Sequence, residues 1–288
     1  MKSAIKKLLP QSVINAARAL RDGHAVNTLA PLNFTAENLK PANSLEFSSI
    51  WADKDIATCW QKDCDEISSV FPESDKWGGI NPGDRRALYY LISALKPQNV
   101  LEVGTHIGAS SVYIAKAMSR YAQEEASLTT VDILDVNDPQ TGAWAGLGME
   151  RSPQGNLEAL DCGELCNFVV NSAQDYMAAL ADDDGKRFDF IFLDGDHTAK
   201  GVYHEMALAL KILKPGGVVL LHDYYPGGQA LFQDGNIIYG PFKALERIQK
   251  QSPHAVVEPL GALAWPTKQG SNQTSLALVM QSAGEDSE

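Results

Sequence analysis

Short apolar runs alternate along most of the chain with segments in which apolar residues recur every three to four positions. The second pattern, as at 109–118 and 198–211, predicts amphipathic helices. The first pattern predicts strands that are buried on both faces, and each run ends in polar residues. Five such strands are expected after residue 80, at 99–103, 128–133, 167–170, 188–193 and 217–221. Strands that alternate with helices indicate a doubly wound α/β fold with a mostly parallel sheet.

The two ends of the chain differ from this repeat. A helix over 241–251 and strands over 255–263 and 275–280 would finish the sheet. The first 80 residues predict helices near 12–20 and over 45–70, without a strand repeat. We therefore expect a helical appendage at 1–80 that acts as a lid or dimer contact, an α/β domain at 81–282 and a disordered tail at 283–288.

The strand at 99–103 ends in a glycine-bounded loop, Glu102-Val-Gly104-Thr-His-Ile-Gly108. Glycine permits backbone conformations and close approaches that a Cβ atom would block. A dinucleotide fold would have the pattern G-x-G-x-x-G, with free amides for a pyrophosphate. Here a carboxylate stands beside the turn, which suits a ligand with a positive charge. Open α/β sheets bind nucleotide-like ligands at such a junction of strand, turn and helix.

The other predicted strands also end in residues that suit a binding site. Asp132 ends the second strand, where an acidic residue can accept both hydroxyls of a ribose; a helix cap or a solvated strand end is the alternative. The third, fourth and fifth strands are followed by 171–175, 194–197 and 222–224. Because the carboxyl ends of parallel strands share one edge of a sheet, these polar segments should lie together.

These motifs resemble those of the class I S-adenosylmethionine-dependent methyltransferases, which have a Rossmann-like seven-stranded sheet. Residues 83–280 look like a small-molecule O-methyltransferase of the catechol type, and like the bacterial group in which DGDH (194–197) and HDY (222–224) end the fourth and fifth strands. The resemblance implies S-adenosylmethionine as cofactor, with Glu102 and Gly104 at its methionine part, Asp132 at the ribose and 172–174 at the adenine. The implied cofactor residues are Glu102, Gly104, Thr105, Gly108, Ser110, Asp132, Ser172, Ala173, Gln174 and Asp194.

The same resemblance implies a metal site. Asp194 and Asp223 fall where the catechol enzymes have two metal-binding aspartates, so Mg²⁺ or a similar divalent cation is expected between them. One position departs from the pattern, because the asparagine that completes that site is Tyr224 here, a poor ligand for Mg²⁺. His222, Asp196 or waters would have to complete the coordination sphere.

Methyl transfer to a hydroxyl group requires that the acceptor lose its proton, and a histidine with a pKa near neutral can take it. His197 lies where the catechol-type enzymes have a catalytic lysine, which makes it the first candidate for the base, and His222 is its rival. The alternatives are that Asp196 and His197 cap the following helix and that His222 packs under the sheet edge. His106, in the first glycine loop, is expected to be an exposed loop residue.

Two loop regions are candidates for contacts with the acceptor. Residues 77–83 predict a turn into a helix over 84–95 that Asp84 would cap, with a substrate contact as the alternative. The long segment 134–166 is rich in glycine and predicts a mobile loop with Trp144 at its tip, or an insertion without a role. Trp144, Tyr225 and Phe232 are candidates for the wall of the acceptor pocket, although such aromatic residues often belong to the core.

Composition narrows the partners. The net charge of −12 argues against a nucleic-acid partner, and a small-molecule acceptor is expected instead. No apolar run approaches the roughly 20 residues that a membrane span needs. The N-terminus does not look like a secretory signal, and the four cysteines lack a zinc-like spacing, so we expect a cytoplasmic protein with reduced thiols, and a homodimer is a further possibility.

Three functions remain open at this point. The first is O-methylation of a small hydroxylated metabolite, such as a sugar or a secondary-metabolite intermediate. The second keeps the cofactor and changes the reaction to N-methylation or hydroxylase-like chemistry. The third is a cofactor-binding protein without turnover. An amine acceptor with a free lone pair needs no metal, so metal dependence distinguishes the first two, and intact Asp194, His197 and Asp223 argue against the third.

Overall fold

A computed structural model describes residues 10–71, 79–122, 124–183, 185–268 and 270–282. Seven strands form one sheet in the order β3-β2-β1-β4-β5-β7-β6, in which the first five are parallel and β7 runs antiparallel to both of its neighbours. The strands are β1 (Asn99–Val103), β2 (Ser127–Asp132), β3 (Cys166–Val170), β4 (Phe188–Leu193), β5 (Leu213–Leu221), β6 (Ala255–Pro259) and β7 (Ala277–Gln281). The prediction of a doubly wound, mostly parallel sheet is confirmed.

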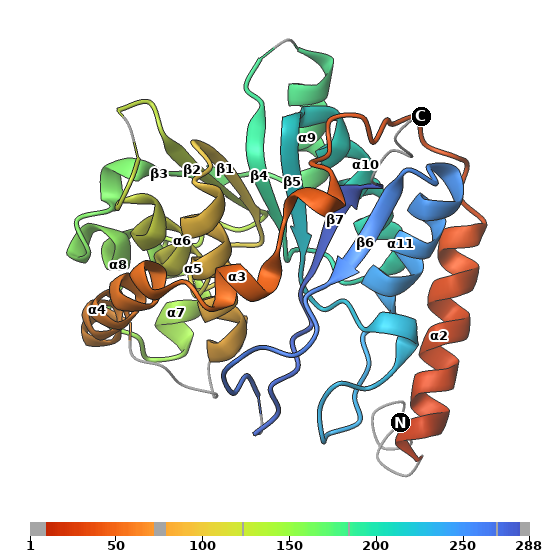
Figure 1. Ribbon diagram of the computed structural model, residues 1–288, viewed down its shortest axis with the longest axis horizontal. Helices are drawn as coiled ribbons and strands as arrows, with labels where there is room; N and C mark the ends of the chain where they lie inside the picture. The colour runs from red at the N-terminus through yellow and green to blue at the C-terminus, as the bar shows by residue number, and fades with distance from the viewer. Residues whose placement is uncertain (1–9, 72–78, 123, 184, 269, 283–288) are drawn as a thin grey trace.

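Helices cover both faces of the sheet (Figure 1). On one face lie α4 (Lys54–Val70), α5 (Pro82–Leu95), α6 (Ser111–Met118) and α8 (Pro153–Ala159), with α3 (Phe47–Trp51) packed on α5. On the other lie α9 (Ala173–Asp182), α10 (Ala199–Ile212) and α11 (Tyr239–Gln251). The remaining elements are α2 (Gln11–Asn27), α7 (Ala143–Gly146) and the 3₁₀ turns at Ala42–Ser44, Gly163–Leu165 and Pro226–Gly228. None of the helices in the described ranges is long and apolar enough to cross a membrane.

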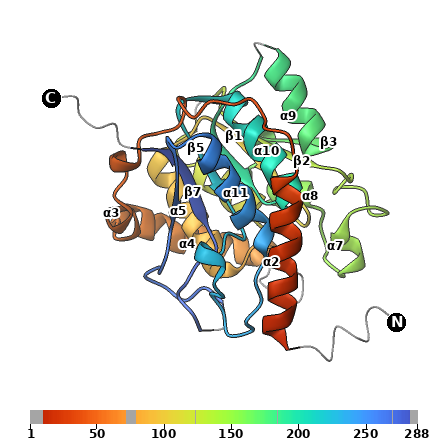
Figure 2. The same ribbon diagram turned by 90° about the vertical axis from the view of Figure 1, so that its right-hand side faces the viewer.

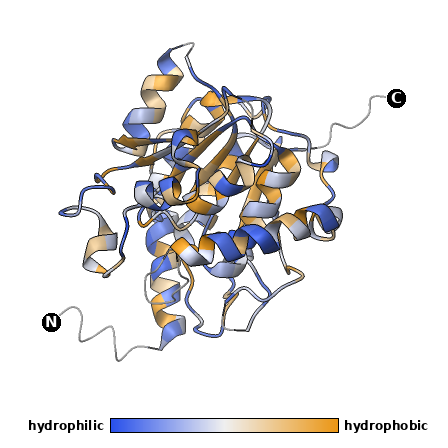
Figure 3. Ribbon diagram, turned by 90° about the vertical axis from the view of Figure 1, so that its left-hand side faces the viewer, coloured by the Kyte–Doolittle hydropathy of each residue, from blue (hydrophilic) through white to orange (hydrophobic). Residues whose placement is uncertain are grey.

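The apolar runs form strands because the central strands are buried on both sides. In β4, Phe190 and Phe192 belong to the core on the α5 side, whereas Ile191 and Leu193 belong to the core on the α10 side. Successive side chains of a strand point to opposite faces, so a strand between two helical layers needs apolar residues at every position. Figure 3 shows these strands as a mostly hydrophobic layer inside helices with polar outer surfaces.

Residues 10–71 pack against the sheet domain on both sides. Ile67 and Phe71 are fully buried in the same core as α5 and α6. The segment that joins α2 to α3 crosses the edge of the sheet, where the Lys40 N–H donates to the Gly217 carbonyl (2.8 Å). Helix α2 lies beside α10 and α11 (Figure 2), and Arg247 of α11 donates to the Leu29 carbonyl (2.9 Å). Whether this region also serves as a lid or dimer contact stays a prediction.

Several expected boundaries are wrong for identifiable reasons. The helix expected over 45–70 is two helices, because the Asp53 side chain accepts from the N–H groups of residues 55 and 56 and starts a new helix there. The cap of α5 is Asn81, whose side chain accepts from the Asp84 N–H (3.0 Å), so Asp84 lies inside the first turn. The segment 134–166 is not one irregular loop, since Ser152 caps the helix α8 within it. Helix α6 begins at Ser111 rather than at residue 109.

The predicted tail at 283–288 and Trp77 lie outside the described residues. The other predicted helices are present, with α2 seven residues longer at its C-terminal end than expected and α10 beginning one residue later. The last two strands are shorter than the expected ones, but they form the expected antiparallel finish.

Candidate active site

A cavity of about 1210 Å³ opens at the carboxyl edge of the sheet. Strand order reverses between β1 and β4, since the chain continues from β1 to β2 on one side and from β4 to β5 on the other. In open α/β sheets this switch point is where ligands bind. The cavity is lined by most of the predicted site residues: Gly104, Thr105, Ser110, Asp132, Ser172, Ala173, Gln174, Asp194, His197, His222 and Asp223.

The floor of the cavity is a close contact between the ends of β1 and β4. Gly104 has a φ of 94°, and a Cβ atom there would overlap the Asp194 carbonyl oxygen. Its N–H donates to the Val131 carbonyl (2.9 Å), while the Asp194 N–H donates to the Val103 carbonyl (2.9 Å). Both strands therefore end level with each other, and glycine is the residue that fits between them.

Glu102 lies beneath this floor rather than in the cavity. Its carboxyl group is fully buried and accepts hydrogen bonds from the Ser110 and Ser111 hydroxyls. Burial raises the pKa of Glu102 to about 7, although these hydrogen bonds act in the opposite direction. The expectation that Glu102 faces the methionine part of the cofactor does not agree with this placement. Its contacts instead fix the loop that leads into α6.

Gly108 is the second predicted cofactor residue that does not line the cavity. Gly108 has a left-handed φ of 75°, and it packs so closely on Pro153 of α8 that a Cβ atom would overlap the proline side chain. Gly104 is therefore explained by the cavity floor, and Gly108 is explained by packing against α8. A sequence pattern cannot separate these two uses, because both require the same small residue.

Asp132 stands at the rim of the cavity, where β2 ends. One of its carboxylate oxygens accepts from the His106 N–H and the other from the Leu134 N–H, both at 3.0 Å. The side chain is thus held between two loops and remains partly exposed. His106 is exposed, as predicted, with a φ of 49°.

The turn after β3 begins α9 at the same rim. Ser172 caps this helix, since its hydroxyl accepts from the Asp175 N–H (3.0 Å). Ala173 and Gln174 form the first turn of the helix and line the cavity. The three residues predicted at the adenine edge are therefore brought to the same cavity as Asp132.

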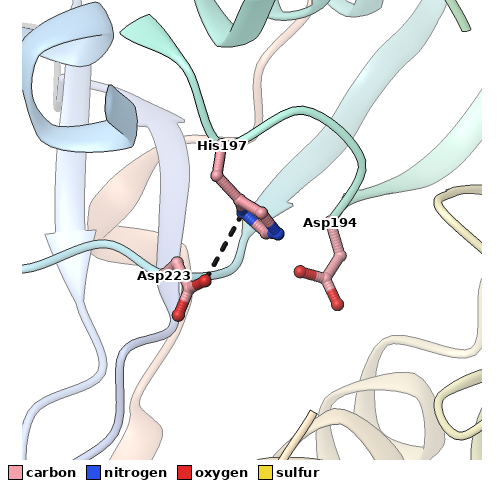
Figure 4. Close-up of side chains that lie close together, drawn as sticks. All are labelled: Asp194, His197 and Asp223. Carbon is pink, nitrogen blue, oxygen red and sulfur yellow. Dashed lines mark ion pairs between the residues drawn. The ribbon is translucent and has the colours of Figure 1, made fainter. Parts of the chain in front are cut away.

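At the other end of the cavity, Asp194, His197 and Asp223 come together (Figure 4). Each of the three offers one ligand atom, and these atoms lie within 4.8 Å of one another. His197 Nδ1 is 3.4 Å from Asp223 Oδ2, and the His197 side chain is 43% exposed, against 15% for Asp223. Two carboxylates that face one imidazole are a donor set that suits a divalent cation, and two nearby carboxylates repel unless something positive lies between them.

The backbone around this cluster is tightly constrained. Asp223 has a left-handed φ of 54°, a conformation that costs a non-glycine residue on the order of 1 kcal/mol. Gly240 of α11 lies against the backbone of His197, where a Cβ atom would overlap the His197 carbonyl oxygen. Thr198 caps α10 directly after this loop. The three side chains of the cluster are therefore held by β4, β5, α10 and α11 together.

His222 lies behind the cluster and is almost fully buried. Its Nδ1 atom is 2.8 Å from Asp194 Oδ1, and its Nε2 atom is 3.6 Å from Asp84 Oδ2. Burial opposes a positive charge on the ring, but the carboxylates of Asp194 and Asp223 outweigh it and raise the pKa of His222 well above its ordinary value. Both ring nitrogens thus face carboxylates.

Asp196 and Tyr224 do not belong to the cluster. Asp196 Oδ1 accepts from the Thr198 N–H (2.7 Å), so this carboxylate serves the start of α10. Tyr224 is buried in the core on the α10 side, and its ring packs against Phe242. Burial raises the pKa of Tyr224 to about 12. The residue at the departing position therefore contributes no ligand.

The three aromatic candidates for the acceptor wall are not in the cavity lining. Trp144 packs on the core of the α5 side, whereas Tyr225 and Phe232 form a small buried cluster with Ile237. Ile237 itself lines the cavity. The two aromatic residues therefore support the wall from behind.

Several cavity residues were missed. Ile238, Tyr239, Arg18, Arg21, Asp22 and Asn236 line the cavity, and none of them was predicted. Gly79 and Ile80 also line it, and they belong to the segment 77–83, for which a substrate contact was the alternative interpretation. Glu205 of α10 also lines the cavity and is buried under the Gly195 turn, and burial followed by the charge of Asp196 raises its pKa to about 8. The one signal for Glu205 in the sequence is that an acidic residue stands on the otherwise apolar face of this helix.

Residues 101–224 match the family model described as "Methyltransferase domain". A "Putative O-methyltransferase" of Mycobacterium sp. (strain JLS) is 26% identical over 156 residues, which are 53% of this chain and 60% of the relative. "Probable caffeoyl-CoA O-methyltransferase 3" of Dictyostelium discoideum is 23% identical over 161 residues, 55% of this chain and 57% of the relative. The match thus spans about 60% of the length of these curated relatives.

Solved structures share the fold over nearly the whole chain. An O-methyltransferase of Streptomyces achromogenes in complex with S-adenosylmethionine has a TM-score of 0.51 at 16% identity, with 96% of this chain and 100% of the other covered. An O-methyltransferase of Bacillus cereus in complex with S-adenosylhomocysteine (SAH) has a TM-score of 0.50 at 16% identity, with 93% and 100% covered. At these identities the comparison establishes the α/β methyltransferase fold alone.

Proposed function

We propose that this chain, which carries a methyltransferase domain over residues 101–224, transfers a methyl group from S-adenosylmethionine to a hydroxyl group of a small molecule. The observation that carries the proposal is the cavity itself. It joins the Gly104 floor and the Asp132 rim to the cluster of Asp194, His197 and Asp223. Its volume of about 1210 Å³ exceeds the roughly 300–1,000 Å³ of a typical ligand pocket, so it has room for a cofactor and an acceptor together.

The cofactor end of the cavity fits an adenosine with a charged methionine tail. The backbone cradle at Gly104 would be filled by any Cβ atom. Asp132 provides a carboxylate at the rim for the ribose hydroxyls, and the first turn of α9 provides a polar edge for the base. The carboxylate of Asp194 at the floor favours the positive charges of an amino group and a sulfonium over a diphosphate.

The acceptor end fits the removal of a hydroxyl proton. We assign a divalent cation to Asp194 and Asp223, which would supply a positive charge that lowers the pKa of a nearby hydroxyl group. We assign the base to His197. Its Nδ1 faces Asp223 Oδ2, which favours the tautomer with the proton on Nδ1 and leaves Nε2 free to accept. The more exposed position of His197, compared with His222, gives an acceptor access to it.

The mouth of the cavity indicates a small acceptor. Ile237, Ile238 and Tyr239 form an apolar wall beside the His197 loop, because Gly240 packs directly against that loop. Arg18 of α2 donates to Asn236 Oδ1 (2.6 Å), and both residues line the cavity beside this wall. We retain a small hydroxylated metabolite as the acceptor class, and the cytoplasm as the location. The net charge of −12 supports a partner other than nucleic acid.

Two measurements test this function. Titration calorimetry should detect binding of SAH, and labelled S-adenosylmethionine should transfer its methyl group to at least one member of a panel of catechols, phenols, sugars and matched amines. Excess chelator should abolish transfer to hydroxyl groups, and Mn²⁺ or Mg²⁺ should restore it. If SAH does not bind, the cofactor assignment is wrong. If SAH binds and only amines are methylated, with no effect of the chelator, the reaction assignment is wrong.

A further inference from the structure

The buried imidazole of His222 connects two carboxylates that lie far apart in the sequence. On one side is Asp194 of the cluster, and on the other is Asp84, in the first turn of α5. We propose that Asp84 and His222 are positioning residues, which together fix the Asp194 carboxylate in the orientation that holds a divalent cation. This inference rests on the cation of the proposed function.

Asp84 is held rigidly at a fully buried position. Asn81 Nδ2 donates to Asp84 Oδ2 (2.7 Å), and the Asn81 side chain also caps the helix. The helix start is anchored from the other side, since Trp265 Nε1 donates to the Gly83 carbonyl (2.9 Å). Gly83 packs so closely on Thr267 that a Cβ atom would overlap its Cα. The Asp84 carboxylate therefore has a fixed place relative to the sheet.

The His222 ring is fixed by the sheet itself. His222 follows β5, and its backbone N–H donates to the Leu193 carbonyl (3.1 Å). The ring lies edge-on to Phe192, with ring centroids 6.4 Å apart. This backbone bond sets His222 level with Asp194, the next residue after Leu193. Nδ1 can then donate to Asp194 Oδ1, which leaves Asp194 Oδ2 for the cluster.

One atom of each residue in this connection lacks a hydrogen-bond partner. Asp84 Oδ1 and His222 Nε2 are both buried without a hydrogen-bond partner in the described part of the chain. An unpaired buried polar group costs about 1–3 kcal/mol, and more when it is charged. Asp84 Oδ2 and His222 Nε2 face each other at 3.6 Å, and their attraction offsets part of the cost of burying both side chains. Neither side chain would have this compensation if the other were absent. Apolar residues would fill the same space at a lower cost, so the pair has its use in what it does to Asp194.

Metal affinity is sensitive to such support. A carboxylate that rotates freely must be ordered when it binds an ion, whereas one that already accepts a hydrogen bond from a fixed donor is ready to bind. Loss of a supporting partner of this kind typically weakens metal binding about 10- to 100-fold. The expected effect of breaking the connection is therefore a weaker cation site in a protein that is still folded.

Two substitutions of His222 separate its two contacts. In His222→Asn the amide group lies where Nδ1 lies and can still donate to Asp194. In His222→Gln the amide reaches toward Asp84 and the contact to Asp194 is lost. Mn²⁺ affinity, measured by electron paramagnetic resonance with SAH present, should fall about 10- to 100-fold in His222→Gln and remain within about threefold to fivefold in His222→Asn.

Asp84 is tested in the same assay. Asp84→Leu should weaken Mn²⁺ binding about tenfold, and Asp84→Asn, which keeps an acceptor for Nε2–H, should recover part of it. Asp189→Asn is the matched control, because Asp189 lies at the opposite end of β4, paired with Lys214. Thermal unfolding of each variant shows whether the fold is intact. SAH affinity, measured separately, tests the cofactor site.

The outcomes are distinct. If the parent binds Mn²⁺ and His222→Gln binds it equally well, the positioning role is wrong while the proposed function stands. If His222→Asn and His222→Gln weaken binding equally and both lower the melting temperature, His222 is a structural residue. If the parent binds SAH but no Mn²⁺, the positioning role fails together with the cation, and the cofactor assignment stands.

Discussion

Asp63 of α4 and Arg120, after α6, form an ion pair in which the Asp63 carboxylate is fully buried. The Tyr89 hydroxyl of α5 also donates to Asp63 (2.6 Å). Three helices therefore meet at one carboxylate, and a second pair, Lys116 with Glu66, lies nearby. Residues 10–71 are connected to the sheet domain by buried polar contacts as well as by the shared apolar core.

The first prediction concerns this connection. Asp63→Asn removes the charge that compensates Arg120 and should lower the free energy of unfolding by about 2 kcal/mol or more, because one member of a buried pair is left without its partner. The loss of stability is limited because Arg120 is one-third exposed, so water can solvate part of its unpaired charge. Urea denaturation measures the change, with Asp65→Asn at an exposed position of the same helix as control. An equal stability of both variants would contradict the role of the pair.

The second prediction uses the buried Glu102. Its pKa is raised to about 7 in the folded protein, whereas a carboxyl group in the unfolded chain ionises near pH 4.3. The unfolded state therefore loses its proton first as pH rises, and the contribution of Glu102 to stability falls between about pH 4.5 and 7. At its largest this loss is on the order of 3 kcal/mol.

Glu102→Gln should remove that loss, because an amide cannot ionise and can still bond to the two serine hydroxyls. The stability of the variant relative to the parent should rise between pH 5 and pH 7.5, measured by urea denaturation at each pH. Glu158→Gln, at an exposed position of α8, controls for the loss of one acidic group. A difference between Glu102→Gln and the parent that does not change with pH would show that Glu102 is ionised throughout.

The sequence predicted the central sheet well because parallel strands buried on both faces have a pattern that few other elements share. The strand ends in the sequence also predict the carboxyl edge of the sheet, and this places Asp194, His197 and Asp223 in one region. Residues that meet the site from other elements carried no such signal. Asp84 lies 138 positions before His222 and looks like an ordinary helix cap, and Arg18 belongs to a helix that showed only an amphipathic pattern.

The direction of a side chain was also beyond the sequence. Glu102 next to a glycine turn suits a cationic ligand, yet the serine hydroxyls that follow eight and nine residues later bind it from below. Tyr224 stands at the sequence position where the catechol-type enzymes have their third metal ligand, but β5 ends with a turn that directs its side chain into the core. Glu102 could face either a ligand or the two serine hydroxyls, and Tyr224 could face either the cavity or the core. The spacing of residues in the sequence does not decide between such alternatives.

The third prediction is that Asp132 determines cofactor affinity. Its carboxylate stands at the rim of the cavity, and the loss of a charged hydrogen-bond acceptor typically costs about 2 kcal/mol, or roughly thirtyfold in affinity. Asp132→Ala should weaken SAH binding by that factor in titration calorimetry. Asp135→Ala, on the exposed loop that follows, should bind SAH as tightly as the parent. Equal affinities of the two variants would remove Asp132 from the ribose site.

The last prediction is that His197, rather than His222, takes the acceptor proton. A positioned base typically contributes about 10²- to 10⁴-fold in rate, so His197→Ala should lose kcat by that order while SAH affinity stays within about twofold. Exogenous imidazole should restore part of the rate, because the small base can enter the partly exposed space that the side chain leaves. His222→Asn should also lower the rate, but imidazole should not restore it, since the His222 side chain is only 10% exposed and both of its ring nitrogens face carboxylates. His204→Ala, on α10, is the control for the loss of a histidine. If imidazole restores the rate in His222→Asn and not in His197→Ala, the base is His222 and the present assignment is wrong.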